Sequence, residues 1–412
     1  MNSYYIQDED NLISFSCVWI NGGSILDKKD KRGLNNILTS LLSRGCYGYD
    51  NFSFSEYVDS YGAELNFDTS EDGILITLKS LKKFSDKLNP LLNLIIEKPN
   101  LDKEEFLSCK IFAKNHLIKS RENPFNIAFE NWRRITYSDH PYSFDVNGYL
   151  EDIDNINYED IISEYNQFKS RNKILLSNFK TKFSSSKNIN QLSNNHKIKN
   201  IYQELNSSFN FSSERIIEYS LDSNQLIIMI GSQTCPINCK DFLILKLLEA
   251  HLSFGMSSEL FKQFREEKGF TYDQGIFFPS RMLKAPFLIY LSVSNENALA
   301  AYKLLINIWE RLKRNNLTEA ETELARKKLY GYTLHSQQTL EDVITRKAKL
   351  ISYGVDHNFD DNLLNKIGNI KPKEIQQVAN KYFNYAYFSI VGKSEITKEI
   401  KNLWNKVNDF YI

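Results

Sequence analysis

The chain has 412 residues, and its 51 basic and 51 acidic side chains give a formal net charge of zero. This length predicts two domains of about 200 residues each. The interspersed charges leave no basic field for nucleic acid or anionic lipid, and no apolar run reaches the roughly 18 residues of a membrane span. The first ten residues, MNSYYIQDED, lack the basic and apolar regions of a secretory signal. We therefore expect a cytoplasmic protein that binds neither nucleic acid nor membrane.

The five cysteines are scattered along the chain, at Cys17, Cys46, Cys109, Cys235 and Cys239. The last two have a C-x-x-x-C spacing, but no second pair and no nearby histidine accompanies them, so they do not match a zinc motif. An odd, scattered set is typical of free thiols in a reducing compartment. We therefore expect no disulfide framework.

The first predicted elements are a strand over residues 13–20 and a helix over residues 34–44 that ends at Gly45. Apolar side chains of the helix recur at the i, i+3, i+4, i+7, i+8 spacing of one buried stripe: Leu34, Ile37, Leu38, Leu41 and Leu42. A second face carries small polar side chains: Asn36, Thr39, Ser40 and Ser43. The pattern predicts a helix packed by one face, whose polar face holds no charged or imidazole group.

The rest of the first half contains an alternating run over residues 73–79, a long helical stretch over 101–119 and a hydrophobic strand over 173–179. A polar stretch rich in Ser and Asn follows, over residues 182–214. Its composition predicts an interdomain linker. The alternative is a long surface loop within one domain.

An internal repeat decides between these alternatives. Three landmarks of the first half recur in the second: Ile153-x-Asn155-Ile156 as Ile367-x-Asn369-Ile370, Asn100-Leu101 as Asn316-Leu317, and the helix ended by Gly45 as a helix over residues 241–254 ended by Gly255. The offsets are 214, 216 and 210 residues. Nearly constant offsets indicate a duplication. We predict homologous domains over residues 1–181 and 215–412, joined by the linker.

The order of elements within each half predicts the fold class. Alternating strands, over residues 73–79 and 287–293, precede long helices, over 101–119 and 319–337, instead of alternating with them. This order favours the α+β class, in which each domain has a mostly antiparallel sheet with helices packed on one face.

The second half also contains a candidate binding segment. Residues 256–267 are predicted to form a helix that Gly269 ends through a positive φ, and an extended segment follows. Arg265 and Tyr272 then flank the helix end and can point into one space. Both side chains donate hydrogen bonds, which suits a carbonyl that gains negative charge. The alternative is an arginine that caps its own helix and a tyrosine that lies in the sheet.

Together these segments resemble the insulinase/pitrilysin family of inverted zinc metallopeptidases, in its two-domain, short-chain form. The resemblance rests on residues 13–45, 62–78 and 104–124 and on HLSFGMSSELFKQFREEKGFTY, residues 251–272. Active members bind zinc through H-x-x-E-H and a distal glutamate. At the motif positions this chain has Asn36, Thr39 and Ser40, and the distal position falls at His116. The resemblance therefore implies a metal site without its ligands, and we expect this chain to bind no zinc and no other cofactor.

The resemblance also implies a role for the second half. In active relatives the residues at the positions of Arg265 and Tyr272 contact the peptide at the scissile bond, and four domains form a clamshell, with two domains per chain where chains pair. Residues 66–69 match the edge strand to which a peptide can add. The leading hypothesis is a non-catalytic, substrate-binding subunit of a heterodimeric zinc metallopeptidase that acts on peptides. Its partner is a homologous two-domain subunit with an intact H-x-x-E-H.

The alternative hypothesis is a catalytically dead scaffold or assembly subunit of a larger complex, which would tolerate the loss of Arg265 and Tyr272. Nothing in the sequence supports a peptidase that acts alone through another nucleophile. The chain has no G-x-S-x-G and no recognisable Cys-His signature, and none of its six histidines forms an i, i+4 pair. It also lacks the phosphate-binding G-x-x-x-x-G-K-[ST] motif.

Overall fold

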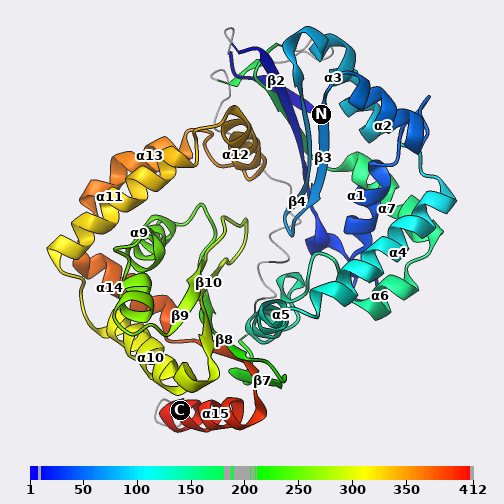
Figure 1. The fold of residues 1–412 in the computed structure, drawn as a ribbon. Helices are drawn as coiled ribbons and strands as arrows, with labels where there is room; N and C mark the ends of the chain where they lie inside the picture. Colours follow the sequence, from blue (N-terminus) through cyan, green and yellow to red (C-terminus); the bar gives the residue numbers. More distant parts are fainter. Residues whose placement is uncertain (8–10, 181–186, 190–204, 206–208, 210, 409–412) are drawn as a thin grey trace. The chain divides into compact units, whose positions relative to one another are not determined.

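The computed structural model describes residues 1–7, 11–180, 187–189, 205, 209 and 211–408, which form two compact units with one sheet each (Figure 1). Unit 1 comprises Met1–Lys119, Phe144–Lys199 and Ser336–Phe359. Unit 2 comprises Ser120–Ser143, Asn200–His335 and Asp360–Ile412. Each unit therefore draws on both halves of the chain.

The sheet of unit 1 has the strand order β3-β4-β2-β5-β1-β6. Its strands are β1 (Asn2–Tyr5), β2 (Ile13–Asn21), β3 (Glu64–Thr69), β4 (Gly73–Leu81), β5 (Lys173–Ser177) and β6 (Lys187–Asn188). Strand β1 pairs in parallel with β5 and β6, and the remaining pairs are antiparallel. Strand β3, which contains residues 66–69, lies at one edge of this sheet.

The sheet of unit 2 has the strand order β7-β11-β8-β10-β9. In the opposite direction, the sheet of unit 1 has the equivalent order β1-β5-β2-β4-β3, with β6 added beside β1. Its strands are β7 (Ile216–Ser220), β8 (Gln225–Gln233), β9 (Thr271–Phe277), β10 (Pro286–Ser294) and β11 (Tyr387–Gly392). Only β7 and β11 pair in parallel. Equivalent strands have similar spacings: β4 and β10 begin 213 residues apart, at Gly73 and Pro286, and β3 and β9 begin 207 residues apart, at Glu64 and Thr271. The shared strand order is what the internal repeat predicts.

Helices of the first half cover one face of the first sheet. Helix α1 (Leu34–Leu42) packs on β3 and α3 (Ser85–Glu97) on β4, while α7 (Tyr158–Ser170) lies beside α1. Unit 1 also contains α2 (Asn51–Ser60), α4 (Lys103–Ser120) and α6 (Leu150–Asn155). The predicted stripe of α1 joins Val18 and Ile76 of the sheet in one buried apolar cluster. This core fixes which face of α1 points away from the sheet.

Unit 2 has a similar arrangement. Helix α9 (Asp241–Ser253) packs on β9, on α14 (Pro372–Phe383) and on α11 (Glu319–His335). Helix α10 (Ala298–Arg314) packs on α14, and α15 (Ser394–Asn408) packs on β7. Helix α13 (Phe359–Lys366) follows α12 in the chain.

The opposite face of each sheet is covered by a helix from the other half of the chain. Helix α12 (Leu340–Ser352) packs on β2 and β5, and α5 (Pro124–Tyr137) packs on β8 and β11 (Figure 1). Neighbouring residues of a strand point to opposite faces. In β2, Val18 therefore joins the core under α1, while the Cys17 Sγ lies 3.9 Å from the Ile344 carbonyl of α12. In unit 2, the Trp132 Nε1 donates to the Tyr387 carbonyl at 3.0 Å.

The predicted α+β class, with two mostly antiparallel sheets, is confirmed. Each repeat places its own helices on one face of its sheet, whereas the helix on the second face comes from the other repeat and was not predicted. Most of the predicted linker, residues 182–214, lies outside the described residues. The boundaries 1–181 and 215–412 stay a prediction. Within the described residues, no helix is both long and apolar enough to cross a membrane.

Candidate functional site

The polar face of α1 carries amide and hydroxyl groups, and residues on this face take part in hydrogen bonds within the first repeat. The Asn36 Nδ2 donates to the Asn147 Oδ1 at 3.1 Å. The Thr39 Oγ1 donates to the Asn35 carbonyl at 2.8 Å, and Thr39 is only 3% exposed. The carbonyl of Ser40 accepts from the Ser43 hydroxyl at 2.7 Å. These positions are therefore used to complete the helix and its surroundings.

The donor set at these positions does not fit zinc. Protein zinc sites use thiolate, imidazole and carboxylate ligands, whereas Asn36, Thr39 and Ser40 offer amides and hydroxyls. His116 lies on α4 and is exposed. Among the residues that the structure describes, no three His, Cys, Asp or Glu side chains are grouped to hold a metal ion. The residues present therefore offer no zinc chemistry on α1.

A buried polar network holds the start of α1. The Asp27 carboxyl group accepts from the Gly33 N–H at 2.8 Å and from the Asn35 N–H at 3.0 Å. The Asn35 side-chain amide also donates to it, at 2.7 Å. Arg171 donates to the Asn35 Oδ1 at 2.8 Å and pairs with the Glu164 carboxylate. Burial raises the pKa of Asp27 to about 7, although the three donors lower it. No sequence pattern indicates this network, because Asp27 opens an ordinary charged loop.

The segment that carries Arg265 is a π-helix, Phe261–Glu266 (η5). Its i→i−5 spacing is seen in the bond from the Glu267 N–H to the Lys262 carbonyl, at 2.9 Å. Gly269 follows with a φ of 63°, and the Phe270 N–H donates to the Phe264 carbonyl at 2.7 Å. The glycine thus has the positive φ that was predicted to end the helix. The π-helical winding was not predicted, and such turns are frequent at functional sites.

Arg265 is exposed, and its guanidinium lies over the Phe261 ring at 5.1 Å from the ring centre. Tyr272 is the second residue of β9, but its side chain lies outside the described part of the structure. The structure therefore places both residues on consecutive elements. That the two side chains meet stays a prediction.

The buried carboxylate of Glu259 connects this segment to two neighbouring helices. The Glu259 Oε2 lies 2.9 Å from the His251 Nε2 at the end of α9, and the Glu259 Oε1 accepts from the Gln263 Nε2 at 2.8 Å. Arg311 of α10 also pairs with Glu259. Three elements are thus tied to one carboxylate next to η5. The sequence analysis missed this cluster, because no helical spacing links residues 251, 259 and 311 and only the fold brings them together.

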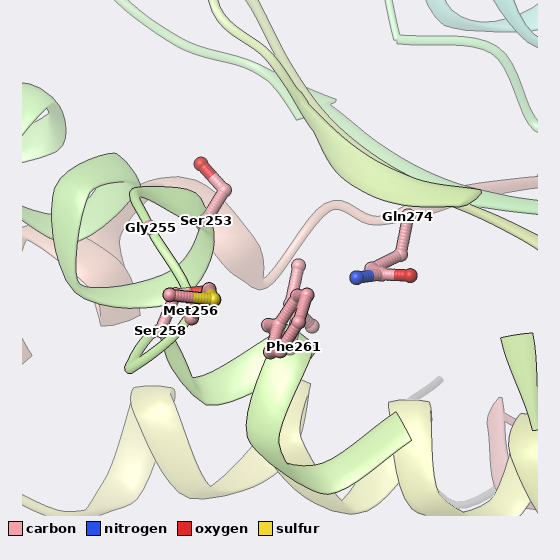
Figure 2. A pocket seen from close by; sticks show the side chains of 7 residues that line it. Ser253, Gly255, Met256, Ser258, Phe261 and Gln274 are labelled. Atoms are coloured by element: carbon pink, nitrogen blue, oxygen red, sulfur yellow. The ribbon is translucent and has the colours of Figure 1, made fainter. Parts of the chain in front are cut away.

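A hollow of about 270 Å³ opens beside η5 (Figure 2). Its lining consists of Ser253, Gly255, Met256, Ser258, Leu260, Phe261 and Gln274. In Figure 2 the Gln274 side chain extends from β9 on one side of the hollow, and Ser253 and Met256 lie on the other side. Phe261 lies between them. The Phe261 ring, which stacks on Arg265, is therefore also a wall of this hollow.

Two buried polar atoms of the hollow have no hydrogen-bond partner among the described residues: the Ser258 Oγ and the Gln274 Oε1. Ser258 is 1% exposed. A hydroxyl both donates and accepts, and an amide oxygen accepts. Buried polar groups are normally paired, so a hollow with a mixed polar and apolar lining and two unpaired polar atoms suits a ligand that has both apolar and amide groups. A short stretch of peptide has this chemistry.

Two sequence profiles of one family match the chain. A profile described as Insulinase (Peptidase family M16) matches residues 4–147, and one described as Peptidase M16 inactive domain matches residues 158–329. Together they span most of the chain and both of its repeats. The chain belongs to the insulinase, or M16, peptidase family.

Individual relatives are distant but cover most of the chain. Non-peptidase homolog YmxG of Helicobacter pylori is 22% identical over an alignment 418 positions long, which covers 95% of this chain and 92% of that protein. Zinc protease PqqE of the same organism is 22% identical over 373 residues, with coverages of 88% and 83%. A crystal structure of a peptidase M16 inactive domain from Pseudomonas fluorescens has a TM-score of 0.79 at 16% identity and covers 95% of both chains. This last likeness shows the shared fold.

Proposed function

We propose that this chain is the non-catalytic, substrate-binding subunit of a heterodimeric zinc metallopeptidase that acts on peptides. One contrast carries the proposal. The helix where the family holds zinc presents Asn36, Thr39 and Ser40, which cannot replace imidazole and carboxylate ligands. In the second repeat, by contrast, Arg265 stands on an anchored π-helix beside a hollow with unpaired polar groups.

The partner in this proposal is a homologous two-domain chain with an intact H-x-x-E-H, and zinc is bound by that chain alone. The names of the two Helicobacter pylori relatives support such a pair, since one organism has a relative named a non-peptidase homolog and another named a zinc protease. Both are similar to this chain over most of their length. The two chains together supply the four domains of a clamshell, and the complex works in the cytoplasm.

Arg265 and Tyr272 complete the partner's active site. A guanidinium and a phenol can donate hydrogen bonds to the scissile carbonyl as it gains negative charge. The zinc of the partner would supply activation of the attacking water. Stacking on Phe261 holds the guanidinium plane in one orientation. The next residue of the peptide enters the hollow, where it pairs with Ser258 and Gln274.

The test is to co-express this chain with an H-x-x-E-H homologue and to assay cleavage of a peptide library. We expect R265A and Y272F each to lower kcat/KM by about two orders of magnitude without preventing assembly. The matched control is K268A, which removes an exposed cation from the same segment and should keep full activity.

The same experiment separates the second candidate function, a scaffold subunit. If the R265A/Y272F double variant assembles and retains wild-type turnover, the two side chains have no catalytic role and the scaffold reading replaces ours. If no H-x-x-E-H homologue copurifies with this chain or gains activity from it, the proposal fails at the level of the partner.

A further inference from the structure

The loop that follows α1 forms a tight turn with an exposed tyrosine at its tip. The Tyr49 N–H donates to the Cys46 carbonyl at 2.8 Å, and the Cys46 N–H donates to the Tyr49 carbonyl at 3.2 Å. Gly48 lies inside the turn with a φ of 88°, which glycine adopts without strain. The Tyr47 N–H donates to the Lys98 carbonyl at 2.8 Å, which ties the turn to the end of α3. Tyr47 is nevertheless 71% exposed.

A hollow of about 360 Å³ lies beside this turn, in unit 1. Tyr47, Tyr49 and Pro99 give it apolar and aromatic walls, while Lys98 and Asn100 add a cation and an amide. It shares no lining residue with the hollow beside η5, which belongs to unit 2. Pockets that combine apolar walls with a few polar groups are typical binding sites.

Aromatic rings continue from this hollow along the seam between α2 and α3 (Figure 1). The ring centres lie 4.9 Å apart for Tyr49 and Tyr57, 5.2 Å for Tyr57 and Tyr61, and 5.0 Å for Tyr61 and Phe84. We call these four residues the aromatic row. They are partly buried and pack on the core of unit 1. Neighbouring rings are inclined by 45° to 67°, so the row presents ridges and grooves instead of one flat surface.

Three exposed lysines border the hollow and the aromatic row. Each ammonium group lies 4.7–5.5 Å from the centre of one aromatic ring, which is the distance of a cation–π contact. The pairs are Lys83 over Phe84, Lys87 over Tyr61 and Lys98 over Tyr47. These contacts hold the positive charges along the seam and leave the ammonium groups accessible to an anionic partner.

No carboxylate offsets the charge of the seam. Asp86 and Glu97 directly precede Lys87 and Lys98, and each therefore lies about 100° around α3 from that lysine. Within the part of the chain that the structure describes, none of the three lysines forms an ion pair. Burial and the two neighbouring phenols of the row raise the pKa of Tyr57 to about 12, so that phenol is uncharged at neutral pH. The seam is therefore a cationic surface with aromatic ridges.

This surface suits an acidic, proline-containing peptide better than a nucleic acid. Bases stack on open, flat ring faces, whereas the rings of the row are inclined to one another and three aromatic faces of the site are covered by lysines. Proline-rich segments in the polyproline II conformation dock into grooves between aromatic side chains. Their carbonyls have no internal hydrogen bonds and can accept from phenol hydroxyls. Acidic side chains of the peptide complement the lysines.

We propose that the hollow and the aromatic row bind an acidic, proline-containing segment of a partner protein in the polyproline II conformation. One proline enters the hollow between Tyr47 and Tyr49, and later prolines lie in the grooves of the row. Glutamate or aspartate side chains of the segment pair with Lys87 and Lys98. Arg265 takes no part, so the site does not rest on the proposed function and needs no zinc-binding partner.

The test is binding of fluorescein-labelled peptides to the full-length chain, measured by fluorescence anisotropy. The probe is a peptide of repeated Pro-Pro-Glu triplets about 12 residues long, which spans roughly 37 Å at ~3.1 Å per residue. Peptides of Pro-Pro-Lys and of Gly-Ser-Glu triplets and a thymidine oligonucleotide of similar length are the comparisons. We expect saturable binding of the Pro-Pro-Glu peptide, weakened by salt, and at least about tenfold weaker binding of the other three.

Two exposed side chains assign the site. Y47A removes an aromatic anchor and should weaken binding of the Pro-Pro-Glu peptide by about tenfold or more. K98A removes one solvent-exposed ion pair and should weaken it by about two- to fivefold. The matched controls are Y330A and K303A, which replace exposed side chains on α11 and α10 of unit 2 and should bind as wild type.

The proposal is overturned if the Pro-Pro-Glu peptide does not bind saturably, or if Y47A binds it as tightly as Y330A does. Equal binding of the Gly-Ser-Glu peptide would show attraction by charge alone, without a role for the aromatic ridges. Tighter binding of the oligonucleotide would replace the peptide by a nucleic acid as the ligand of this surface.

Discussion

At the scale of single residues, the first repeat shows what holds the helix that lies at the zinc-binding position of the family. Asp27 accepts three hydrogen bonds at the start of α1 and is almost fully buried. The network continues through Asn35 to Arg171 and Glu164. Each of these groups would be costly to leave unpaired in the interior. The helix is therefore held in place by polar contacts of its own.

The raised pKa of Asp27 predicts a pH dependence of stability. Because the folded-state pKa is about 7 and the unfolded value is about 3.9, the folded state binds the extra proton between these values. The contribution is thus fully present below about pH 4 and is lost as the pH rises through 7. D27N does not titrate. We expect the unfolding free energy of wild type minus that of D27N to fall by up to about 4 kcal/mol between pH 4 and 8.

Urea denaturation of both proteins at several pH values measures this difference. Comparing the two proteins cancels the titration of all groups that they share. A difference that is constant, or that grows with pH, would show that Asp27 is ionised in the folded protein at neutral pH. The position of the proton would then have to be revised, but the hydrogen bonds to α1 would stand.

Only some of these residue-level features could be predicted from the sequence. The stripe of α1 and its polar face could be predicted, because helical period is a local property. The structural roles of Asp27 and Glu259 could not be predicted. A carboxylate takes such a role only when folding buries it away from water and brings hydrogen-bond donors to it from distant parts of the sequence. The side-chain placement of Tyr272 stays a prediction.

At the scale of elements, strands and helices followed the sequence closely. Helix α11 begins at Glu319 and β5 at Lys173, as expected. The end of the helix at Gly269 could be predicted because glycine adopts a positive φ without strain. The π-helical winding of η5 could not be predicted, since its side-chain pattern over so few residues is the same as that of an α-helix. Glu259, which precedes the wider turn, contacts His251 of α9 and Arg311 of α10.

This account of η5 gives a prediction for Glu259. E259A removes the common partner of His251, Gln263 and Arg311 and leaves two of them in a partly buried position. We expect a loss of about 2–4 kcal/mol in unfolding free energy. Thermal unfolding of E259A beside E266A measures this loss, because Glu266 is exposed on the same segment and its replacement should be nearly neutral.

If E259A unfolds at the same temperature as E266A, the carboxylate does not anchor the segment. A second readout separates anchoring from simple destabilisation. E259Q keeps the size of the side chain and a hydrogen-bond acceptor for Gln263 and should restore part of the loss, whereas an effect of the lost charge alone would leave E259Q as unstable as E259A.

At the scale of the whole molecule, each compact unit takes one helix from the other repeat. The duplication was readable from constant offsets, but this exchange was not. The apolar face of an amphipathic helix is the same whichever sheet it covers, so α5 and α12 carry no sequence signal that assigns them. The result is that neither repeat has a complete core by itself.

The exchange predicts the behaviour of separated repeats. A fragment of residues 1–181 lacks α12 and would expose Cys17, Trp19 and their neighbours on the second face of its sheet. We expect this fragment to aggregate or to unfold without cooperativity. Fusing residues 336–359 to its end through a flexible linker should restore a cooperative transition, and fusing residues 120–143 instead should not. A stable monomeric 1–181 fragment would show that α12 is dispensable for unit 1.

We propose that this chain lacks catalytic zinc but completes the active site of a homologue that has it. The most direct measurement is zinc content together with peptidase activity, for the purified chain alone and for the chain mixed with an H-x-x-E-H homologue from the same organism. The account predicts no zinc and no cleavage for the chain alone, and cleavage by the mixture with one zinc ion per pair. Stoichiometric zinc and peptide cleavage by this chain on its own would contradict it.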